Sequence, residues 1–373
     1  MRPVRPFALE RFFAKYEFQV KYPASASDCE TFSLTELLAL ADDETRCRWI
    51  NLQLGYTETA GHPALRDAVA ALHESAGRAD VLIMAPEEAI FVAMHALLSP
   101  GDHVIGLAPA YQSLLDVPAI IGCDVSAWHL VPQNGAWTIN FESLAALCEP
   151  KTKALIVNFP HNPTGFHPTR ATFDKILDFA RQRNLWVFSD EIYRFTELDA
   201  NLRLPAVCDV YERGISFGGL SKAFGLPGLR IGWIVSHQST FLRDCVEWRD
   251  YTTICNSAPS EILAVAALKA KQHILDRQVG LLAQNYKLAQ AFFSEYPDLF
   301  FWRPPTAGPV CVVEWRGPYP FSELFGRLLE RSVLMAPGQL FGCGKNDFRL
   351  GLGRRSFPDT LDQIREAIRL DLR

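Results

Sequence analysis

The residue of this chain that is best placed to do covalent chemistry is a lysine in a glycine-rich segment. Lys222 lies within Ser216–Trp233, directly after a short apolar run that predicts a strand, and Arg230 follows in the same segment. A lysine whose pKa is lowered can form a Schiff base with a carbonyl group, and a nearby arginine can bind a phosphate through two parallel hydrogen bonds. A single lysine in a loop is usually a surface residue, so this interpretation depends on what other segments contribute.

Two further segments place polar side chains at the ends of apolar runs. Asn162 lies in Asn158–Gly165, and Asp190 and Tyr193 belong to Ser189–Tyr193. In open α/β sheets, ligands bind at the carboxyl ends of the strands. There an asparagine can donate to a ring oxygen, an aspartate can pair with a protonated pyridine nitrogen, and a tyrosine can hydrogen-bond the phenolic oxygen of the same ring. The structural alternatives are a tight turn for the first segment and a helix cap for the second.

The order and spacing of these residues resemble the fold-type-I pyridoxal-phosphate enzymes, and specifically the class I/II aminotransferases, from about residue 32 to residue 369. The resemblance implies that pyridoxal 5′-phosphate is the cofactor and that a small α-amino acid is the substrate. Lys222, Tyr193 and Asp190 would be the catalytic residues, and Asn162 and Arg230 would also bind the cofactor. Lys222 would hold the cofactor as a Schiff base and then remove the Cα proton, which gives a quinonoid intermediate.

Three other segments match the same family residue by residue. Tyr56 opens the segment that continues to Leu65-Arg66. The family tyrosine at this place reaches the cofactor phosphate of the other subunit, which implies a homodimer. Tyr111, preceded by Pro-Ala, would stack on the face of the cofactor ring. Arg349, followed by Leu-Gly-Leu-Gly, would bind the substrate α-carboxylate together with Asn162.

The expected phosphate-binding segment departs from the family pattern. Ala85, Pro86 and Glu87 stand where relatives carry small or amide residues, and backbone N–H groups at a helix start bind phosphate there. Pro86 has no N–H, so we expect the Glu87 amide to bind the phosphate, with the Glu87 carboxylate turned away. Gly219 stands where many relatives have a phosphate-binding serine, and Ser221 is the candidate to replace it.

A second and more local resemblance concerns residues 16–30 and short segments elsewhere. They are similar to capreomycidine-synthase-like enzymes, which act on a hydroxylated arginine by β-elimination and ring closure. The resemblance implies Glu17, Ser27 and Asp28 as substrate-binding residues, with the acids facing a guanidinium or ammonium group. The alternative is that Ser27 or Asp28 caps a helix and Glu17 is solvated. Transamination and a lyase or cyclase reaction therefore both stay open, and the intact Lys222 disfavours a non-catalytic cofactor-binding module.

The composition excludes several classes of protein. The chain has 37 Lys and Arg residues against 42 Asp and Glu residues, a net charge of −5, which disfavours a nucleic-acid partner. No apolar stretch reaches the ~18 residues of a membrane span, and the N-terminus lacks the apolar core of a signal peptide. Nine cysteines without a C-x-x-C pair predict reduced thiols in a cytoplasmic protein. Without C-x-x-C or H-E-x-x-H, the sequence predicts no metal site.

The elements that must position these residues follow from the hydrophobic pattern. Short apolar runs predict strands that are buried on both faces of a sheet, and amphipathic stretches between them predict helices. This alternation predicts an α/β fold with a mostly parallel sheet. The family resemblance implies a mixed sheet covered by helices, as in aspartate aminotransferase. The predicted strands are Val81–Met84, His103–Leu107, Ala154–Phe159, Leu185–Ser189, Ile215–Gly218 and Ile231–Val235, and the helices include Glu87–Leu98, Asn140–Leu147 and Thr169–Arg183.

The pattern changes towards the C-terminus. Ser260–Gln290 predicts one long helix, and the remainder predicts an α+β unit. Its strands are expected at Pro309–Trp315, Val333–Met335 and Phe348–Gly351, and its helices at Phe321–Glu330 and Pro358–Leu370. The first 45 residues are mainly helical (Pro6–Tyr16 and Ser33–Ala41) and should pack near this unit. We therefore expect a large cofactor-binding domain of residues 46–275 and a small domain formed by residues 1–45 and 276–373.

Overall fold

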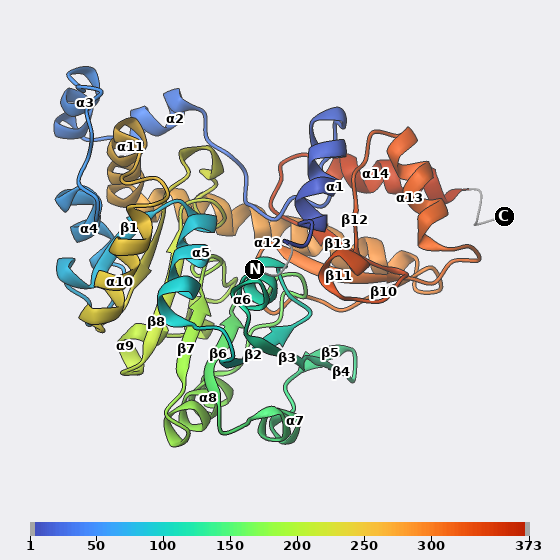
Figure 1. Cartoon of the computed structure of the whole chain (residues 1–373). Helices are drawn as coiled ribbons and strands as arrows, with labels where there is room; N and C mark the ends of the chain where they lie inside the picture. The colour runs from blue at the N-terminus through green and yellow to red at the C-terminus, as the bar shows by residue number, and fades with distance from the viewer. Residues whose placement is uncertain (1–3, 370–373) are drawn as a thin grey trace.

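The computed structural model describes residues 4–369, and a seven-stranded sheet forms its centre (Figure 1). The strand order is β1-β9-β8-β7-β6-β2-β3. The pairs among β8, β7, β6, β2 and β3 are parallel, whereas β9 is antiparallel to both of its neighbours. The predicted α/β class with a mostly parallel mixed sheet is therefore confirmed. The strands are β1 (Val81–Met84), β2 (His103–Ala108), β3 (Asp124–His129), β6 (Thr152–Asn158), β7 (Trp186–Asp190), β8 (Gly214–Gly219) and β9 (Gly232–Val235).

Helices cover both faces of this sheet, because its strands are apolar on both sides. In β6, Ala154 and Ile156 face a core shared with α5, α6 and α10, whereas Leu155 and Val157 face an opposite core shared with α7 and α8. Helices α4 and α11 extend the cover of that second face. These helices are α4 (Pro63–Ala70), α5 (Pro86–Leu97), α6 (Ser113–Ile121), α7 (Phe141–Leu147), α8 (Arg170–Gln182), α10 (Ser239–Arg249) and α11 (Ala258–Lys269).

A second, four-stranded sheet follows later in the chain and is antiparallel throughout, in the order β10-β11-β13-β12. It shares one apolar core with α12, α13 and α14. The predicted strand at Val333–Met335 is wrong, since Val333 forms only an isolated bridge with Tyr22 and β12 begins at Ala336. The elements are β10 (Phe300–Trp302), β11 (Val310–Trp315), α13 (Phe321–Glu330), β12 (Ala336–Pro337), β13 (Asp347–Gly351) and α14 (Phe357–Ile368). Leu370, the expected end of α14, lies outside the described residues.

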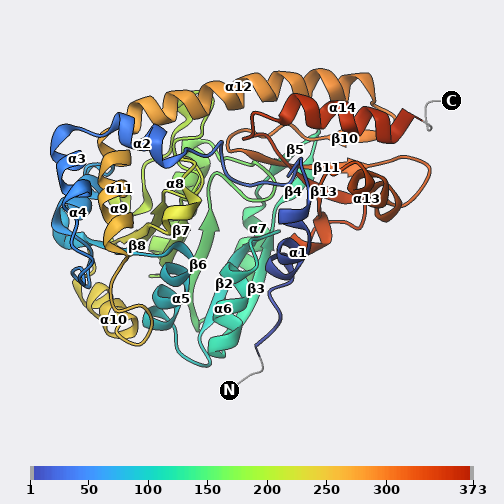
Figure 2. The same ribbon diagram turned by 90° about the horizontal axis from the view of Figure 1, so that it is seen from above.

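The single long helix expected at Ser260–Gln290 is two helices. At Ala270 the backbone leaves helical geometry, with φ −93° and ψ 14°, between α11 and α12 (Lys271–Glu295). Figure 2 shows α12 running from the large sheet to the four-stranded sheet. It therefore connects the two halves of the molecule as one continuous element.

The N-terminal segment contacts both halves. Tyr22 exchanges backbone hydrogen bonds with the chain beside Val333, and α1 (Ala8–Tyr16) lies close to α13 in both views (Figures 1 and 2). Further along, α2 (Leu34–Leu40) places Leu37 in the core that contains α4 and α11, and α3 (Asp43–Ile50) follows it. The domain boundaries near residues 45 and 275 stay predictions.

Some elements are absent from the sequence prediction. They include the helices α3, α4, α6 and α10, the edge strand β3, the hairpin β4 (Val131–Gln133) and β5 (Ala136–Thr138), the strand β10 and the short helix α9 (Val207–Val210). Within residues 4–369, none of the helices combines the length and the apolar character that crossing a membrane requires.

Candidate active site

The predicted site residues meet at the carboxyl edge of the large sheet. Tyr111 follows β2, Asn162 follows β6, Asp190 ends β7 and Lys222 follows β8, and parallel strands bring these positions to one edge. A cavity of about 610 Å³ opens there. Among the predicted residues, its walls include Glu17, Ser27, Asp28, Pro86, Glu87, Tyr111, Asn162, Asp190, Tyr193, Ser221, Lys222, Arg230 and Arg349.

Lys222 is held at the centre of this cavity. Its Nζ donates a hydrogen bond of 2.9 Å to Ser27 Oγ, and its carbonyl accepts one of 3.1 Å from the Cys29 amide. Burial lowers the pKa of Lys222, the nearby Asp28 opposes that shift, and Arg349 adds to it. A lowered pKa increases the fraction of neutral amine, which is the form that acts as a nucleophile or a base.

Asp190 and Tyr193 line the same cavity as Lys222. Asp190 Oδ1 accepts a hydrogen bond of 3.0 Å from the Ile192 amide, and burial raises the pKa of the carboxyl to about 7. A carboxylate buried in this way gains most from a cationic partner. Burial also raises the pKa of Tyr193, so the phenol keeps its proton and can donate it in a hydrogen bond.

Arg349 and Asn162 line the same cavity and contact each other. Arg349 Nη1 donates to Asn162 Oδ1 at 3.0 Å and Nη2 donates to the Ser25 carbonyl at 2.7 Å, while Nε is buried without a hydrogen-bond partner. The guanidinium also lies 4.6 Å from the ring centroid of Phe341. It is fixed in place, 1% exposed, and it has unused donor capacity for a carboxylate.

The end of the cavity near α5 can bind a phosphate. The first N–H groups of a helix have no intrahelical partner, and α5 begins at Pro86, so the Glu87 amide is the first that is available. Ser221 Oγ is buried and has no hydrogen-bond partner, and Arg230 lines the same cavity. At Gly219, a Cβ would come within 2.9 Å of Ile192 Cδ1, so a side chain there would need Ile192 to move.

The Glu87 carboxylate lies between α5 and α6. Its Oε2 accepts a hydrogen bond of 3.4 Å from Ser113 Oγ, and burial raises its pKa. Tyr111 lines the same side, and its hydroxyl donates to Glu10 Oε1 at 3.4 Å. A raised pKa makes the neutral form of Glu87 more accessible, which reduces the repulsion that an anion at this end would meet.

The N-terminal segment forms a wall that the sequence did not fully reveal. Leu9, Glu10 and Phe13 of α1 line the cavity, and so does Arg354 after β13. No family motif includes these residues, and the amphipathic pattern of α1 was the one available signal. Arg354 Nη2 lies 2.8 Å from both carboxylate oxygens of Asp28. Asp28, predicted to bind substrate, is therefore already engaged by an arginine of the chain itself.

Two predicted residues lie apart from the cavity wall. Tyr56 is 94% exposed and lines a separate, smaller cavity beside α11. A tyrosine so exposed contacts nothing in its own active site, which fits a role toward another subunit. Ala85 is the N-cap of α5, and its amide donates to Glu88 Oε2 at 3.3 Å. It closes the first turn of α5 without reaching the cavity.

Comparison with known proteins identifies the family. The model of the family described as aminotransferase class I and II matches residues 44–368. The chain belongs to this family. Class I and II aminotransferases of this fold depend on pyridoxal 5′-phosphate, which is therefore the cofactor. The buried, unpartnered Ser221 Oγ and the Asp190 carboxylate fit its phosphate and its ring nitrogen.

Individual relatives perform more than one kind of reaction. Capreomycidine synthase of Streptomyces vinaceus is 30% identical over 339 residues, which are 90% of this chain and 86% of the relative. Arginine–pyruvate transaminase of Pseudomonas aeruginosa is 29% identical, over 84% of this chain and 80% of the relative. The crystal structure of a pyridoxal-phosphate-dependent aminotransferase from Streptococcus suis superposes with a TM-score of 0.91 at 29% identity, covering 100% of this chain and 99% of the other.

Proposed function

We propose that this enzyme is an aminotransferase that acts on an α-amino acid. The observation that carries the proposal is that Lys222, Asp190 and Arg349 line one cavity. Lys222 supplies the amine that binds the cofactor, and Arg349 supplies the site for the substrate α-carboxylate. Family membership and the arginine–pyruvate transaminase relative support the same reaction.

Each residue has a separable task. Arg349 and Asn162 bind and orient the α-carboxylate. This fixes the direction of the Cα–H bond of the substrate relative to the catalytic groups. Lys222 Nζ takes the proton from Cα, because burial has lowered its pKa, and the ammonium group so formed would give that proton to the cofactor carbon rather than back to Cα. The carboxylate of Asp190 stabilises positive charge on the ring nitrogen, and Tyr193 O–H donates to the ring oxygen. When bound, the cofactor supplies the electron sink for the charge that develops at Cα.

The role of Lys222 can be tested by spectroscopy. The purified protein should be yellow, and borohydride should bleach it and fix the cofactor to the chain. Lys222→Ala should lose the fixed cofactor, whereas Lys175→Ala, on the exposed side of α8, should keep it. A Lys222→Ala protein that still retained borohydride-fixed cofactor would overturn the assignment.

The alternative reaction is β-elimination or cyclisation on a β-substituted, arginine-like amino acid. Two carboxylates near the entrance, Glu10 and Glu17, favour a cationic side chain in the substrate. Burial raises the pKa of Glu17, and the charges of Asp28 and Glu10 raise it further. A guanidinium or ammonium group would relieve this repulsion. Both the synthase and the arginine transaminase among the relatives are consistent with such a substrate.

One experiment separates the two reactions. The holoenzyme is incubated with single amino acids, including arginine and β-substituted arginines, without a keto-acid acceptor. An aminotransferase stops after one stoichiometric conversion of the cofactor to its amine form. A lyase or cyclase continues and releases ammonia or water catalytically. Ammonia, the amino-acid products and the cofactor spectrum are measured together, because ring closure with loss of water releases no ammonia, and each result then excludes one of the reactions.

We also propose that the enzyme acts as a homodimer in the cytoplasm. The exposed Tyr56 supports the dimer, because its family counterpart binds the cofactor of the other subunit. The buried cysteines Cys29, Cys208, Cys245 and Cys311 form no disulfide, which is consistent with a reducing compartment.

A further inference from the structure

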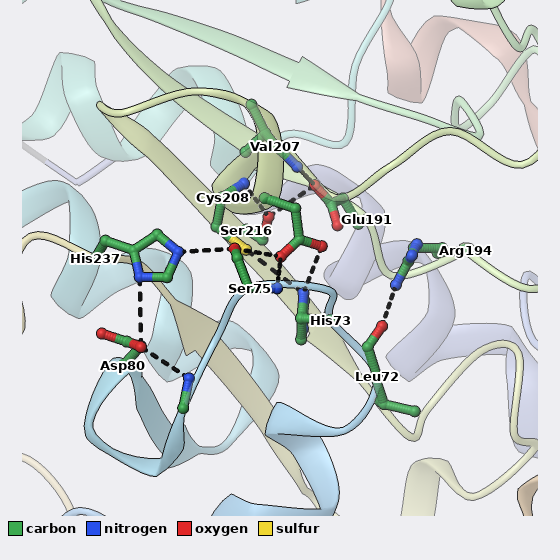
Figure 3. A network of polar contacts seen from close by, with 12 residues as sticks. Leu72, His73, Ser75, Asp80, Glu191, Arg194, Val207, Cys208, Ser216 and His237 are labelled. Atoms are coloured by element: carbon green, nitrogen blue, oxygen red, sulfur yellow. Dashed lines mark hydrogen bonds and ion pairs between the residues drawn. The ribbon is translucent and has the colours of Figure 1, made fainter.

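A second cluster of reactive side chains lies outside the active-site cavity. It joins His73, in the segment after α4, to Cys208 and Asp209 of α9, the short helix that packs on β8 (Figure 3). None of the three lines the cavity of Lys222. Because His73 and Cys208 are 135 residues apart in the sequence, no local sequence motif predicts the cluster.

The three side chains direct their donor atoms at one another. His73 Nδ1 lies 3.4 Å from Cys208 Sγ and 3.8 Å from Asp209 Oδ2, and the three donor atoms lie within 4.8 Å of one another. Ligand atoms around a tetrahedral zinc ion are separated by about 3.3–3.6 Å, given bonds of about 2.0–2.3 Å. A small inward movement of Asp209 would bring this cluster to that geometry.

Only one of the two carboxylate oxygens of Asp209 accepts hydrogen bonds. Its Oδ1 accepts hydrogen bonds from the Ser75 amide at 3.0 Å and from Ser75 Oγ at 2.8 Å. Its Oδ2, which faces His73, has no hydrogen-bond partner, although the side chains of His73 and Asp209 are only 3% and 0% exposed. Leaving a buried polar atom unpaired costs about 1–3 kcal/mol, and more if it is charged. A bound cation would satisfy Asp209 Oδ2 directly.

The surrounding contacts hold two of the three donor residues, Asp209 and Cys208, in place. Ser75 Oγ, which binds Asp209, also lies 2.9 Å from His237 Nε2 (Figure 3). The Cys208 amide donates to Ser216 Oγ at 3.1 Å, and Ser216 Oγ donates to Glu191 Oε1 at 2.9 Å. These bonds orient the carboxylate of Asp209 and fix the backbone of Cys208, whereas His73 Nε2 is buried without a hydrogen-bond partner.

We propose that His73, Cys208 and Asp209 bind a zinc ion. The set of one thiolate, one imidazole and one carboxylate suits a borderline-soft divalent metal rather than Mg²⁺ or Ca²⁺. The Cys208 thiol releases its proton to solvent as the Zn–S bond forms, and a water molecule completes the tetrahedron. The ion links α9 to the segment after α4 and has a structural role. This proposal does not depend on the reaction at Lys222.

The test is metal uptake by the holoenzyme. The protein is dialysed against a chelator, loaded with zinc sulfate, passed through a desalting column and analysed for zinc by elemental analysis. We expect about one zinc per chain. Cys208→Ser and Asp209→Asn should retain zinc at least tenfold more weakly in competition with a chelator. Cys47→Ser, which removes an exposed thiol elsewhere, should bind like the wild type.

A second measurement uses the wild-type protein and does not depend on whether a variant folds. Cobalt(II) added to the wild-type holoenzyme should produce a thiolate-to-cobalt charge-transfer band in the difference spectrum. One equivalent of zinc should abolish it. If wild-type protein retains no stoichiometric zinc and shows no such band, the cluster is only a hydrogen-bonded group and the proposal is wrong. It is equally wrong if a folded Cys208→Ser protein retains zinc and the cobalt band like the wild type.

Discussion

At the scale of single residues, the active site contains buried ionisable groups that are only partly paired within the chain. Asp190 is buried at the end of β7, and its pKa is raised to about 7 by that burial. Arg349 is buried with an unpartnered Nε, and burial lowers its pKa. Burying such groups costs free energy in the cofactor-free protein. The ring nitrogen of the cofactor and the carboxylate of the substrate would offset that cost. The site is therefore built for bound cofactor and substrate.

The free-energy cost of burying Asp190 should be measurable as a pH-dependent stability of the cofactor-free protein. Its folded pKa of about 7 lies above the unfolded value of about 3.9, so between these pH values the folded state binds the extra proton. Stability should fall as pH rises through this window, by up to roughly 4 kcal/mol. In Asp190→Asn this contribution disappears. Urea unfolding at pH 5 and pH 8 measures it, and equal pH dependence in both proteins would contradict the prediction.

Arg349 should determine substrate affinity without determining cofactor binding. Arg349→Lys removes the planar pair of donors and should lower kcat/KM by about 100-fold, roughly 2.7 kcal/mol. The visible spectrum of the bound cofactor should not change. Arg365→Lys, at an exposed ion pair on α14, is the control and should be near wild type. A loss of cofactor absorbance in Arg349→Lys would show that this arginine serves the cofactor instead.

Much of this site could be predicted from the sequence because several of its residues lie at or just after the carboxyl ends of buried strands. Asn162, Asp190 and Lys222 are close in space for the reason that parallel strands end at one edge. Glu10 and Arg354 could not be predicted, because they reach the cavity through the tertiary packing of the chain ends. The engagement of Asp28 by Arg354 is also a long-range contact that no local pattern records.

At the scale of elements, apolar runs identified the buried strands well and the exposed strand β3 poorly. The residues of β1, at one edge of the sheet, and of β6, in its interior, are almost all buried, so their runs are continuous. In β3, at the edge of the sheet, only Trp128 is fully buried, and the run is broken by polar residues. The break at Ala270 was missed because helix-forming residues continue across it. Neither hydrophobic pattern nor propensity marks a short backbone deviation inside a helical stretch.

Helix α1 and the turn that follows it should set the preference for a cationic substrate. Both Glu10 and Glu17 face the cavity from this segment. Glu17→Gln should lower the ratio of kcat/KM for arginine to that for leucine by about tenfold, since a charge-assisted hydrogen bond is lost. Glu142→Gln, in the first turn of α7, should leave the ratio unchanged. An unchanged ratio in both Glu17→Gln and Glu10→Gln would show that these acids do not select the substrate.

At the scale of the whole molecule, net charge and local charge differ. The chain carries a net charge of −5, yet Lys222, Arg230 and Arg349 all line one cavity. The surface also exposes large apolar side chains close to the segment of Tyr56. Leu54 is 84% exposed, Tyr251 is 90% exposed and Ile254 is 52% exposed. The segments of these residues approach each other, since Thr57 Oγ1 donates to the Asn256 carbonyl at 3.1 Å, and we expect another molecule to cover apolar groups exposed there.

If that molecule is a second copy, each active site combines residues of two chains. Tyr56→Ala and Lys222→Ala should each be inactive or nearly so as pure dimers. After the two are unfolded together and refolded at equal concentration, half of the dimers are hybrids. Each hybrid has one site with an intact Lys222 and an intact Tyr56, so roughly a quarter of wild-type activity should return. Activity that stays at the level of the separate variants would place Tyr56 outside the partner's site.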